Sequence, residues 1–193
     1  IFFRVVLSAI MGLIVLPLAG CTLCLTGLLA AVCACVYCLT RHVTSKSPAA
    51  QYAPVVFVTI AWASLYYLFL FAQSAAKFHV YAKLKEKEDK VTFKEVKWGT
   101  KGGQLGLTMD RTVGNYLEQA PLFLVGLWAY AALVSVPTAA VLGLAWVASR
   151  CYYPFGFYYG PPLLFLSTLP GYSIIALFFW GLARAALTDE YGE

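Results

Sequence analysis

Three residues of one long apolar segment have side chains that can bind a charged ligand together. Arg111, Asn115 and Glu118 occupy positions i, i+4 and i+7, and residues at these spacings share one face of an α-helix. A guanidinium group can hold a carboxylate, and a glutamate side chain can hold an ammonium group. The pattern predicts a site for a small zwitterion. The structural alternative is that this face pairs with Lys77, Arg150 or tyrosines of neighbouring helices.

These residues occur in a chain with the composition of a membrane protein. Of 193 residues, 61% are hydrophobic and 12% are charged, and the net charge is +5. Soluble proteins have about 25% charged residues. The composition therefore excludes a soluble domain, intrinsic disorder, a coiled coil and a disulfide-rich secreted module. The basic residues concentrate between Lys77 and Arg111, mixed with acidic ones, which is typical of a membrane flank and argues against nucleic-acid binding.

The apolar segments predict an all-α integral membrane protein with five transmembrane helices. A span needs about 20 residues. We expect an additional N-terminal transmembrane helix within residues 1–40, a linker at 41–54, a four-helix bundle at 55–187 and a C-terminal tail at 188–193. Within the bundle, the helices are expected at residues 55–72 with a polar continuation, 111–136, 138–153 and 161–187.

The long hydrophilic stretch at residues 85–110 is expected to be a flexible loop outside the membrane. It contains KEKEDK and four glycines, without the spacing of a phosphate-binding loop. Prolines mark the other boundaries. Pro137 is expected to turn the chain between two spans, Pro161 and Pro162 to lie in the first turn of the last helix, and Pro170 to kink that helix.

The basic residues also predict the orientation of the chain in a multi-pass arrangement. With five spans, most of them lie on the side of the long loop. By the positive-inside rule, this side faces the cytosol or its organellar equivalent. A chain that begins at Ile1 fits a processed precursor or a partial chain, and removal of a targeting sequence favours an endomembrane or organelle membrane.

Two Cys-x-x-Cys pairs in the first span superficially resemble a zinc site. Residues 14 positions apart on one helix are separated by roughly 21 Å along its axis, so the pairs cannot share one ion. Cys21, Cys24, Cys35 and Cys38 are therefore predicted to be small buried side chains, and no metal is expected.

A tyrosine-rich segment follows Arg150 at residues 152–159. An interfacial aromatic belt explains it. The alternative is that its hydroxyl groups, including that of Tyr153, contact a polar ligand held at Asn115. Since the spans show neither inverted repeats nor polar residues through the bilayer centre, the sequence argues against a transporter or channel.

The string RTVGNYLEQAPLFLVGLW at residues 111–128 resembles the signature of the MAPEG family, the membrane-associated proteins in eicosanoid and glutathione metabolism. The resemblance covers roughly residues 55–187. It implies a four-helix transmembrane bundle that forms homotrimers and binds glutathione between subunits near the cytosolic face. Carried over by position, Arg111, Asn115 and Glu118 would hold the glutathione peptide and Tyr153 would contact it, while Lys77 is a weaker match near the glutathione carboxylates.

The resemblance implies attack by a glutathione thiolate on a lipophilic electrophile or peroxide. Active members place an arginine early in the last helix, beside the thiol, whereas this chain has Pro161 to Phe165 there. Arg150 or Lys77, from the same or another subunit, would have to replace that cation. Gln119 also stands where several members have tyrosine. The sequence therefore leaves open whether the protein is an enzyme.

Two functions fit these observations. The first is a glutathione-dependent transferase or peroxidase that acts on lipophilic substrates. The alternative is a non-catalytic structural or accessory subunit of a larger organellar membrane complex. The additional first span and the aromatic residues suit contacts with other membrane subunits and with membrane lipids.

Overall fold

The structure is a computed structural model, and it describes residues 48–87, 90–98 and 100–190. Within these ranges every regular element is helical, which confirms an all-α chain. The elements are η1 (Pro48–Tyr52), α3 (Ala53–Lys85), α4 (Phe93–Trp98), η2 (Thr100–Gly102), α5 (Gly103–Leu133), α6 (Val136–Cys151), α7 (Tyr153–Tyr159) and α8 (Leu163–Glu190). The predictions for the helix at residues 1–40, most of the linker and the four cysteines Cys21, Cys24, Cys35 and Cys38 lie outside the described residues.

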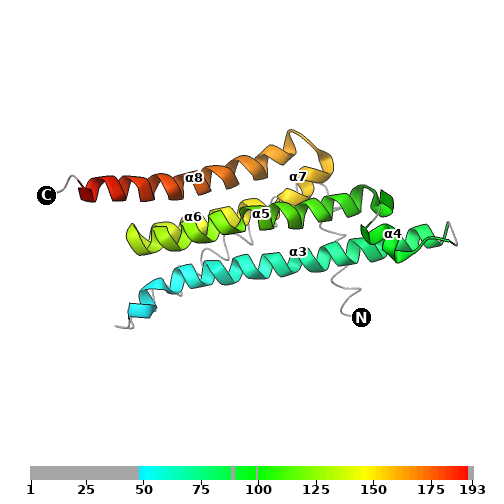
Figure 1. Ribbon diagram of the computed structural model, residues 1–193, viewed down its shortest axis with the longest axis horizontal. Helices are drawn as coiled ribbons and strands as arrows, with labels where there is room; N and C mark the ends of the chain where they lie inside the picture. Colours follow the sequence, from blue (N-terminus) through cyan, green and yellow to red (C-terminus); the bar gives the residue numbers. More distant parts are fainter. Residues whose placement is uncertain (1–47, 88–89, 99, 191–193) are drawn as a thin grey trace, which may run out of the picture.

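The long helices α3, α5, α6 and α8 run along the same axis, and successive helices alternate in direction (Figure 1). Helices α5 and α6 pack against each other, and each also contacts α3 and α8. Helices α3 and α8 therefore lie on opposite sides of the α5–α6 pair. The short helix α7 follows α6 and packs on α5 and α8, while α4 lies at the end of the bundle where α3 ends.

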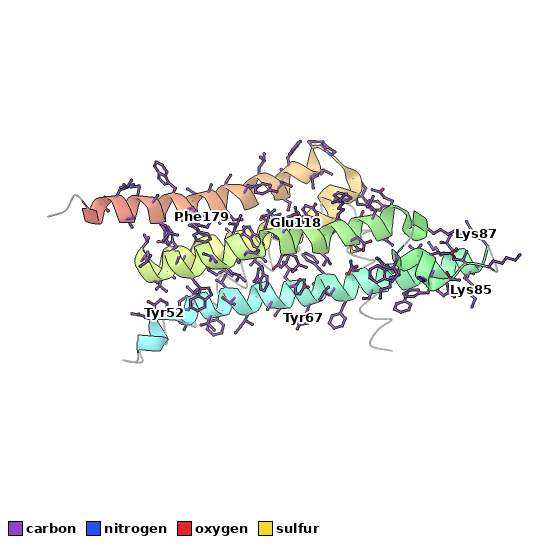
Figure 2. All side chains as sticks on the ribbon, in the orientation of Figure 1. Tyr52, Tyr67, Lys85, Lys87, Glu118 and Phe179 are labelled. Atoms are coloured by element: carbon purple, nitrogen blue, oxygen red, sulfur yellow. The ribbon has the colours of Figure 1, made fainter. Side chains whose placement is uncertain are left out.

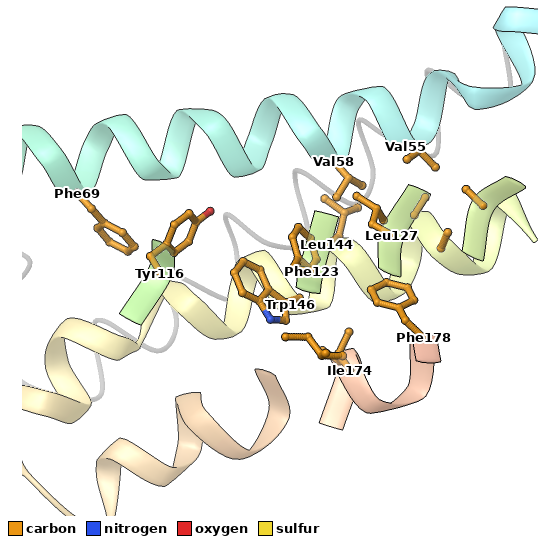
Figure 3. Packing of buried hydrophobic residues seen from close by; sticks show 14 of the residues in the cluster. Val55, Val58, Phe69, Tyr116, Phe123, Leu127, Leu144, Trp146, Ile174 and Phe178 are labelled. Atoms are coloured by element: carbon orange, nitrogen blue, oxygen red, sulfur yellow. The ribbon is translucent and has the colours of Figure 1, made fainter. Parts of the chain in front are cut away.

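The core consists of large side chains that interdigitate between these helices (Figure 3). The rings of Phe123 and Trp146 stack with centroids 4.0 Å apart, and Phe178 of α8 packs beside Phe123. At Gly143 a Cβ would lie 2.7 Å from the Val58 side chain, so this glycine allows α6 to approach α3 closely. In a lipid environment, such close packing takes over much of the role that apolar burial has in water.

The loop predicted at residues 85–110 is wrong in part, because this stretch contains α4, η2 and the start of α5. A capping box begins α4: the Thr92 N–H donates to Glu95 Oε2 at 2.8 Å, and the Glu95 N–H donates to Thr92 Oγ1 at 3.4 Å. Helix α5 begins at Gly103, two turns before Arg111. The polar residues between these two positions therefore lie on a helix.

Two proline-marked boundaries and the start of the C-terminal tail also differ from the prediction. Ser135 caps α6 by accepting a hydrogen bond from the Thr138 N–H at 3.4 Å, so Pro137 lies in the first turn of α6. Pro161 and Pro162 form a turn that precedes α8. Helix α8 continues to Glu190, and the first residues of the expected tail at 188–193 are therefore helical.

Two segments of the described chain, Ala50–Lys85 and Leu163–Thr188, are long and apolar enough to cross a membrane. Their outward faces carry large exposed apolar side chains, among them Phe71 on α3 and Trp180 on α8. Apolar surfaces of this extent mark contacts with lipid or with other proteins. Helix α6 has 16 residues, fewer than the roughly 20 that a perpendicular span needs.

Candidate functional site

The last turn of helix α6 contains a buried arginine, Arg150, that links three helices. Arg150 has only 1% of its surface exposed. Its guanidinium group lies over the Trp146 ring, with Cζ 5.1 Å from the ring centroid. Nη1 donates a hydrogen bond to Asn115 Oδ1 of α5 at 2.9 Å, and Nη2 donates to the Ser167 carbonyl oxygen of α8 at 3.3 Å. The side chain thus joins α5 and α8 through the interior of the bundle.

Small residues of α8 make room for this guanidinium group. A Cβ at Gly171 would collide with the Arg150 guanidinium group, so only glycine fits there without a shift. One turn earlier, the Ser167 hydroxyl donates to the Ser149 carbonyl oxygen at 2.6 Å, and the Ser149 hydroxyl donates to the Trp146 carbonyl oxygen at 2.7 Å. Both serine hydroxyls therefore donate to backbone carbonyl oxygens, and the hydrogen bonds of Arg150 go to other acceptors.

The positive charge of Arg150 has neutral acceptors only: within the described residues, no carboxylate contacts it. Its Nε is buried without a hydrogen-bond partner. The neighbouring Gln119 donates to Asn115 Oδ1 at 3.2 Å, while its own Oε1 is also buried without a partner. Because an uncompensated buried charge is costly, an anionic group placed beside Arg150 would be stabilised.

The predicted line of Arg111, Asn115 and Glu118 lies on α5 at the border between the interior and the outer surface. Asn115 turns inward to Arg150, whereas Arg111 and Glu118 are exposed. At 100° per residue, the three positions span an arc of about 60° around the helix. A strip of this width at the border can have one side chain in the interior and two on the surface. Figure 2 shows Glu118 well inside the length of the bundle, far from Lys85 at its charged end. It is mid-helix because α5 starts at Gly103.

Tyr153 connects the inner and outer parts of this region. It is the first residue of α7 and is buried. Its hydroxyl group lies within electrostatic reach of Arg150, Arg111 and Glu118. The structure therefore gathers five of the six residues that the sequence singled out, with Asn115 as the fifth, into one region where α5, α6 and α7 meet.

Lys77, the sixth candidate residue, lies outside this region, in contact with α4 and α5. Its Nζ lies 2.8 Å from Asp110 Oδ1 and donates a hydrogen bond to the Lys97 carbonyl oxygen at 2.9 Å. The Gln73 side chain donates to the same Asp110 oxygen at 2.7 Å. This group of residues, here called the Lys77 node, ties α3 to α4 and α5. Its cation already has a carboxylate partner.

Sequence reasoning missed Asp110, Trp146, Ser167 and Gly171. Ser167 and Gly171 are four positions apart on an apolar helix, a spacing that places small residues on one packing face and that could have indicated a close approach. Which residue approaches that face depends on the register between α6 and α8. No pattern within either helix carries that information.

A model of the MAPEG family matches residues 52–184, a range that includes α3, α5, α6, α7, most of α8 and all six candidate residues. No curated protein matches the chain. The family is membrane-associated, in agreement with the two helices that are able to cross a membrane. Since the match covers well over half of the sequence, the chain belongs to the MAPEG family.

Proposed function

We propose that this protein binds glutathione and uses its thiolate to attack lipophilic electrophiles or peroxides. The observation that carries the proposal is the buried guanidinium group of Arg150, which is bonded to neutral acceptors and keeps a free Nε–H. A thiol has a pKa of about 8.5 in water, and a nearby cation in an apolar site favours its ionised form. Arg150 supplies such a cation, although α8 begins without a basic residue.

The alternative cation, Lys77, is less suited to this role. Its ammonium group is paired with Asp110, and stabilising a thiolate would require breaking that ion pair. Arg150 has no such competitor among the described residues. Of the two candidates, Arg150 is therefore the one whose charge remains available to a bound anion.

The exposed pair Arg111 and Glu118 would hold the peptide part of glutathione. Glutathione carries two carboxylates and one ammonium group, which match a guanidinium group and a glutamate side chain. Both side chains face outward from the single chain. The proposed site therefore needs a second protein surface to enclose the ligand, and a neighbouring copy of the chain in a homotrimer would provide it. Tyr153 interacts electrostatically with Arg111, Glu118 and Arg150, which supports a role for it as a further ligand contact.

The proposed setting is an endomembrane or organelle membrane crossed by α3, α5, α6 and α8. The basic residues concentrate around the end of α3 and in α4, so this end would face the cytosol or its organellar equivalent. Glutathione would enter from that side, and lipophilic substrates would reach the site laterally from the bilayer.

Calorimetric titration of the detergent-purified protein with glutathione tests the binding step. Wild type is expected to bind saturably, and Glu118→Gln to bind about tenfold more weakly or worse, since a charge-assisted hydrogen bond is worth about 1.5–3 kcal/mol. Glu86→Gln removes an exposed charge beyond the end of α3 and is expected to bind like wild type. Absence of binding to wild type at millimolar glutathione would rule out the enzyme.

A specific observation favours the second candidate, an accessory subunit without catalysis. Both Nη atoms of Arg150 are bonded within the chain, so the side chain already has a structural use in joining α5 to α8. The mass of the native particle separates the candidates. A homotrimer of 21.1 kDa chains supports the enzyme, whereas a large hetero-complex that lacks glutathione binding supports the accessory subunit.

A further inference from the structure

A groove of about 510 Å³ opens between the C-terminal part of α8, the end of α5 and the start of α6. It lies at the end of the bundle opposite α4, where α8 ends (Figure 1). Leu142 and Leu177 give it apolar walls, and Trp180 and Tyr130 add aromatic surface. Its volume is in the range of about 300–1,000 Å³ that is typical of ligand pockets.

The shape of the groove depends on a glycine. A Cβ at Gly181 would collide with the Tyr130 ring, so the glycine allows this ring to lie close to α8. Tyr130 also packs against Phe178 of α8, at 5.6 Å between ring centroids. The end of the groove nearer the core is therefore a fixed surface rather than a gap between loosely packed helices.

One cation stands at the outer end of this apolar groove. Arg184 lines the groove and is exposed, and within the described residues no carboxylate pairs with it. Thr188, one turn later, lines the same side. The groove thus combines apolar walls with a positive rim.

We propose that this groove binds an anionic phospholipid, with the phosphate on Arg184 and an acyl chain along Leu142, Leu177 and Trp180. The apolar walls favour a hydrocarbon chain, and the guanidinium group favours a phosphate. Arginine and tryptophan near the end of a membrane helix sit at the level of lipid headgroups. Arg184 lies 13 positions after Gly171 on α8, about 20 Å along the axis, so the lipid site is separate from the Arg150 region.

Native mass spectrometry of the detergent-purified full chain tests this proposal. Phosphatidylglycerol and phosphatidylcholine with identical acyl chains are the probes. The first is expected to bind more tightly, and Arg184→Gln to weaken its binding about fivefold, with a smaller effect on phosphatidylcholine, whose choline cation offsets the charge of the phosphate. Lys94→Gln removes an exposed positive charge at the opposite end and is expected to leave both lipids unchanged. Equal affinity of wild type and Arg184→Gln for phosphatidylglycerol would overturn the proposal.

A second variant tests the acyl-chain part of the site. Ala185→Phe places a ring in the groove and keeps Arg184, so it is expected to weaken the binding of both lipids. Leu187→Phe adds a ring at an exposed position that does not line the groove, and is expected to bind like wild type. Inorganic phosphate is expected not to compete. If it displaced phosphatidylglycerol at equal concentration, the site would be a simple anion site and the phospholipid assignment would be wrong.

Discussion

The described part of the chain contains two buried cations, Lys77 and Arg150, with opposite surroundings. Lys77 is paired with the Asp110 carboxylate and bonded to a backbone carbonyl oxygen. Arg150 is more deeply buried, and its described partners are an amide oxygen, a carbonyl oxygen and an indole ring. Both side chains join helices, but only the uncompensated charge of Arg150 keeps a strong preference for an anion. This difference favours a structural role for Lys77 and supports the proposed role of Arg150 in stabilising a bound thiolate.

The two sites also differ in their contact with solvent. The Asp110 side chain is 43% exposed, so water screens the Lys77 ion pair and reduces its net contribution. Arg150 is only 1% exposed, and water cannot replace a missing counterion there. A bound thiolate would gain more from Arg150 than from a cation at the surface, because electrostatic interactions strengthen as water is excluded.

Replacing Arg150 is expected to have the largest effect on activity. Arg150→Met keeps much of the side-chain volume but removes the charge, so kcat/KM with a lipophilic electrophile should fall by about 10²–10³. Thermal stability should change little, because the unpaired charge no longer has to be buried. Lys77→Met should show the reverse, with lower stability and retained activity. Equal losses of both quantities in both variants would remove the distinction between the cations.

Gly171→Ala disturbs Arg150 without changing its charge. The new Cβ collides with the guanidinium group, so we expect a loss of about 1–3 kcal/mol in the free energy of unfolding, with reduced activity. At Gly114 on α5 an added Cβ meets no atom within 4 Å, and Gly114→Ala should be neutral or stabilising by up to about 1 kcal/mol. Thermal unfolding in detergent measures both. A stable, fully active Gly171→Ala protein would contradict the proposed position of Arg150.

Asp110→Asn tests the Lys77 node. It leaves Lys77 without a counterion, and we expect a loss of roughly 1–2 kcal/mol in the free energy of unfolding, reduced from the value for a fully buried pair because Asp110 is half-exposed. The difference in the free energy of unfolding between wild type and Asp110→Asn should become smaller at high salt. A double-mutant cycle of Asp110→Asn and Lys77→Met, measured by unfolding at two salt concentrations, gives the coupling energy between Lys77 and Asp110. A coupling energy near zero would mean that the ion pair does not hold α3 and α5 together.

The smallest expected effect concerns α4, whose Lys97 carbonyl oxygen binds Lys77. Hydrogen bonds from the Thr92 N–H and hydroxyl hold the pKa of Glu95 below its ordinary value. A lowered pKa in the folded state stabilises α4 above the unfolded-state pKa of about 4.3, and this contribution disappears as the pH falls through the lowered value. The protection factors of the α4 amides, which are corrected for the intrinsic pH dependence of hydrogen exchange, should therefore fall as the pH drops below the unfolded-state value. Glu95→Gln should abolish this pH dependence, and an unchanged dependence would contradict it.

The face of Arg111, Asn115 and Glu118 could be predicted because spacing within one helix is fixed by the chain itself. The partner of Asn115 could not be chosen, since that depends on how α6 and α5 pack. The same limit applies to Lys77. Its cation was visible in the sequence, but Asp110 lies on another helix, 33 positions away.

The missed helix α4 has a different explanation. It has only six residues, too few for an apolar period to show, and it lies in a charged stretch. The Thr92-x-x-Glu95 pattern was present and is a helix-start signal. The prediction of a loop rested on the charged run and the nearby glycines and did not use this signal. Gly103 has a positive φ of 62° and is the first residue of α5. This glycine therefore allows the chain to turn into a helix and does not mark a long flexible segment.

The ionisation of bound glutathione tests the central claim most directly. The ultraviolet absorbance of the thiolate, followed against pH in the detergent-purified protein, gives the pKa of the bound thiol. In wild type it should lie clearly below the value of about 8.5 for a free thiol, and in Arg150→Met it should return toward that value. A wild-type protein that binds glutathione with an unshifted thiol pKa would contradict the assignment of Arg150 to thiolate stabilisation.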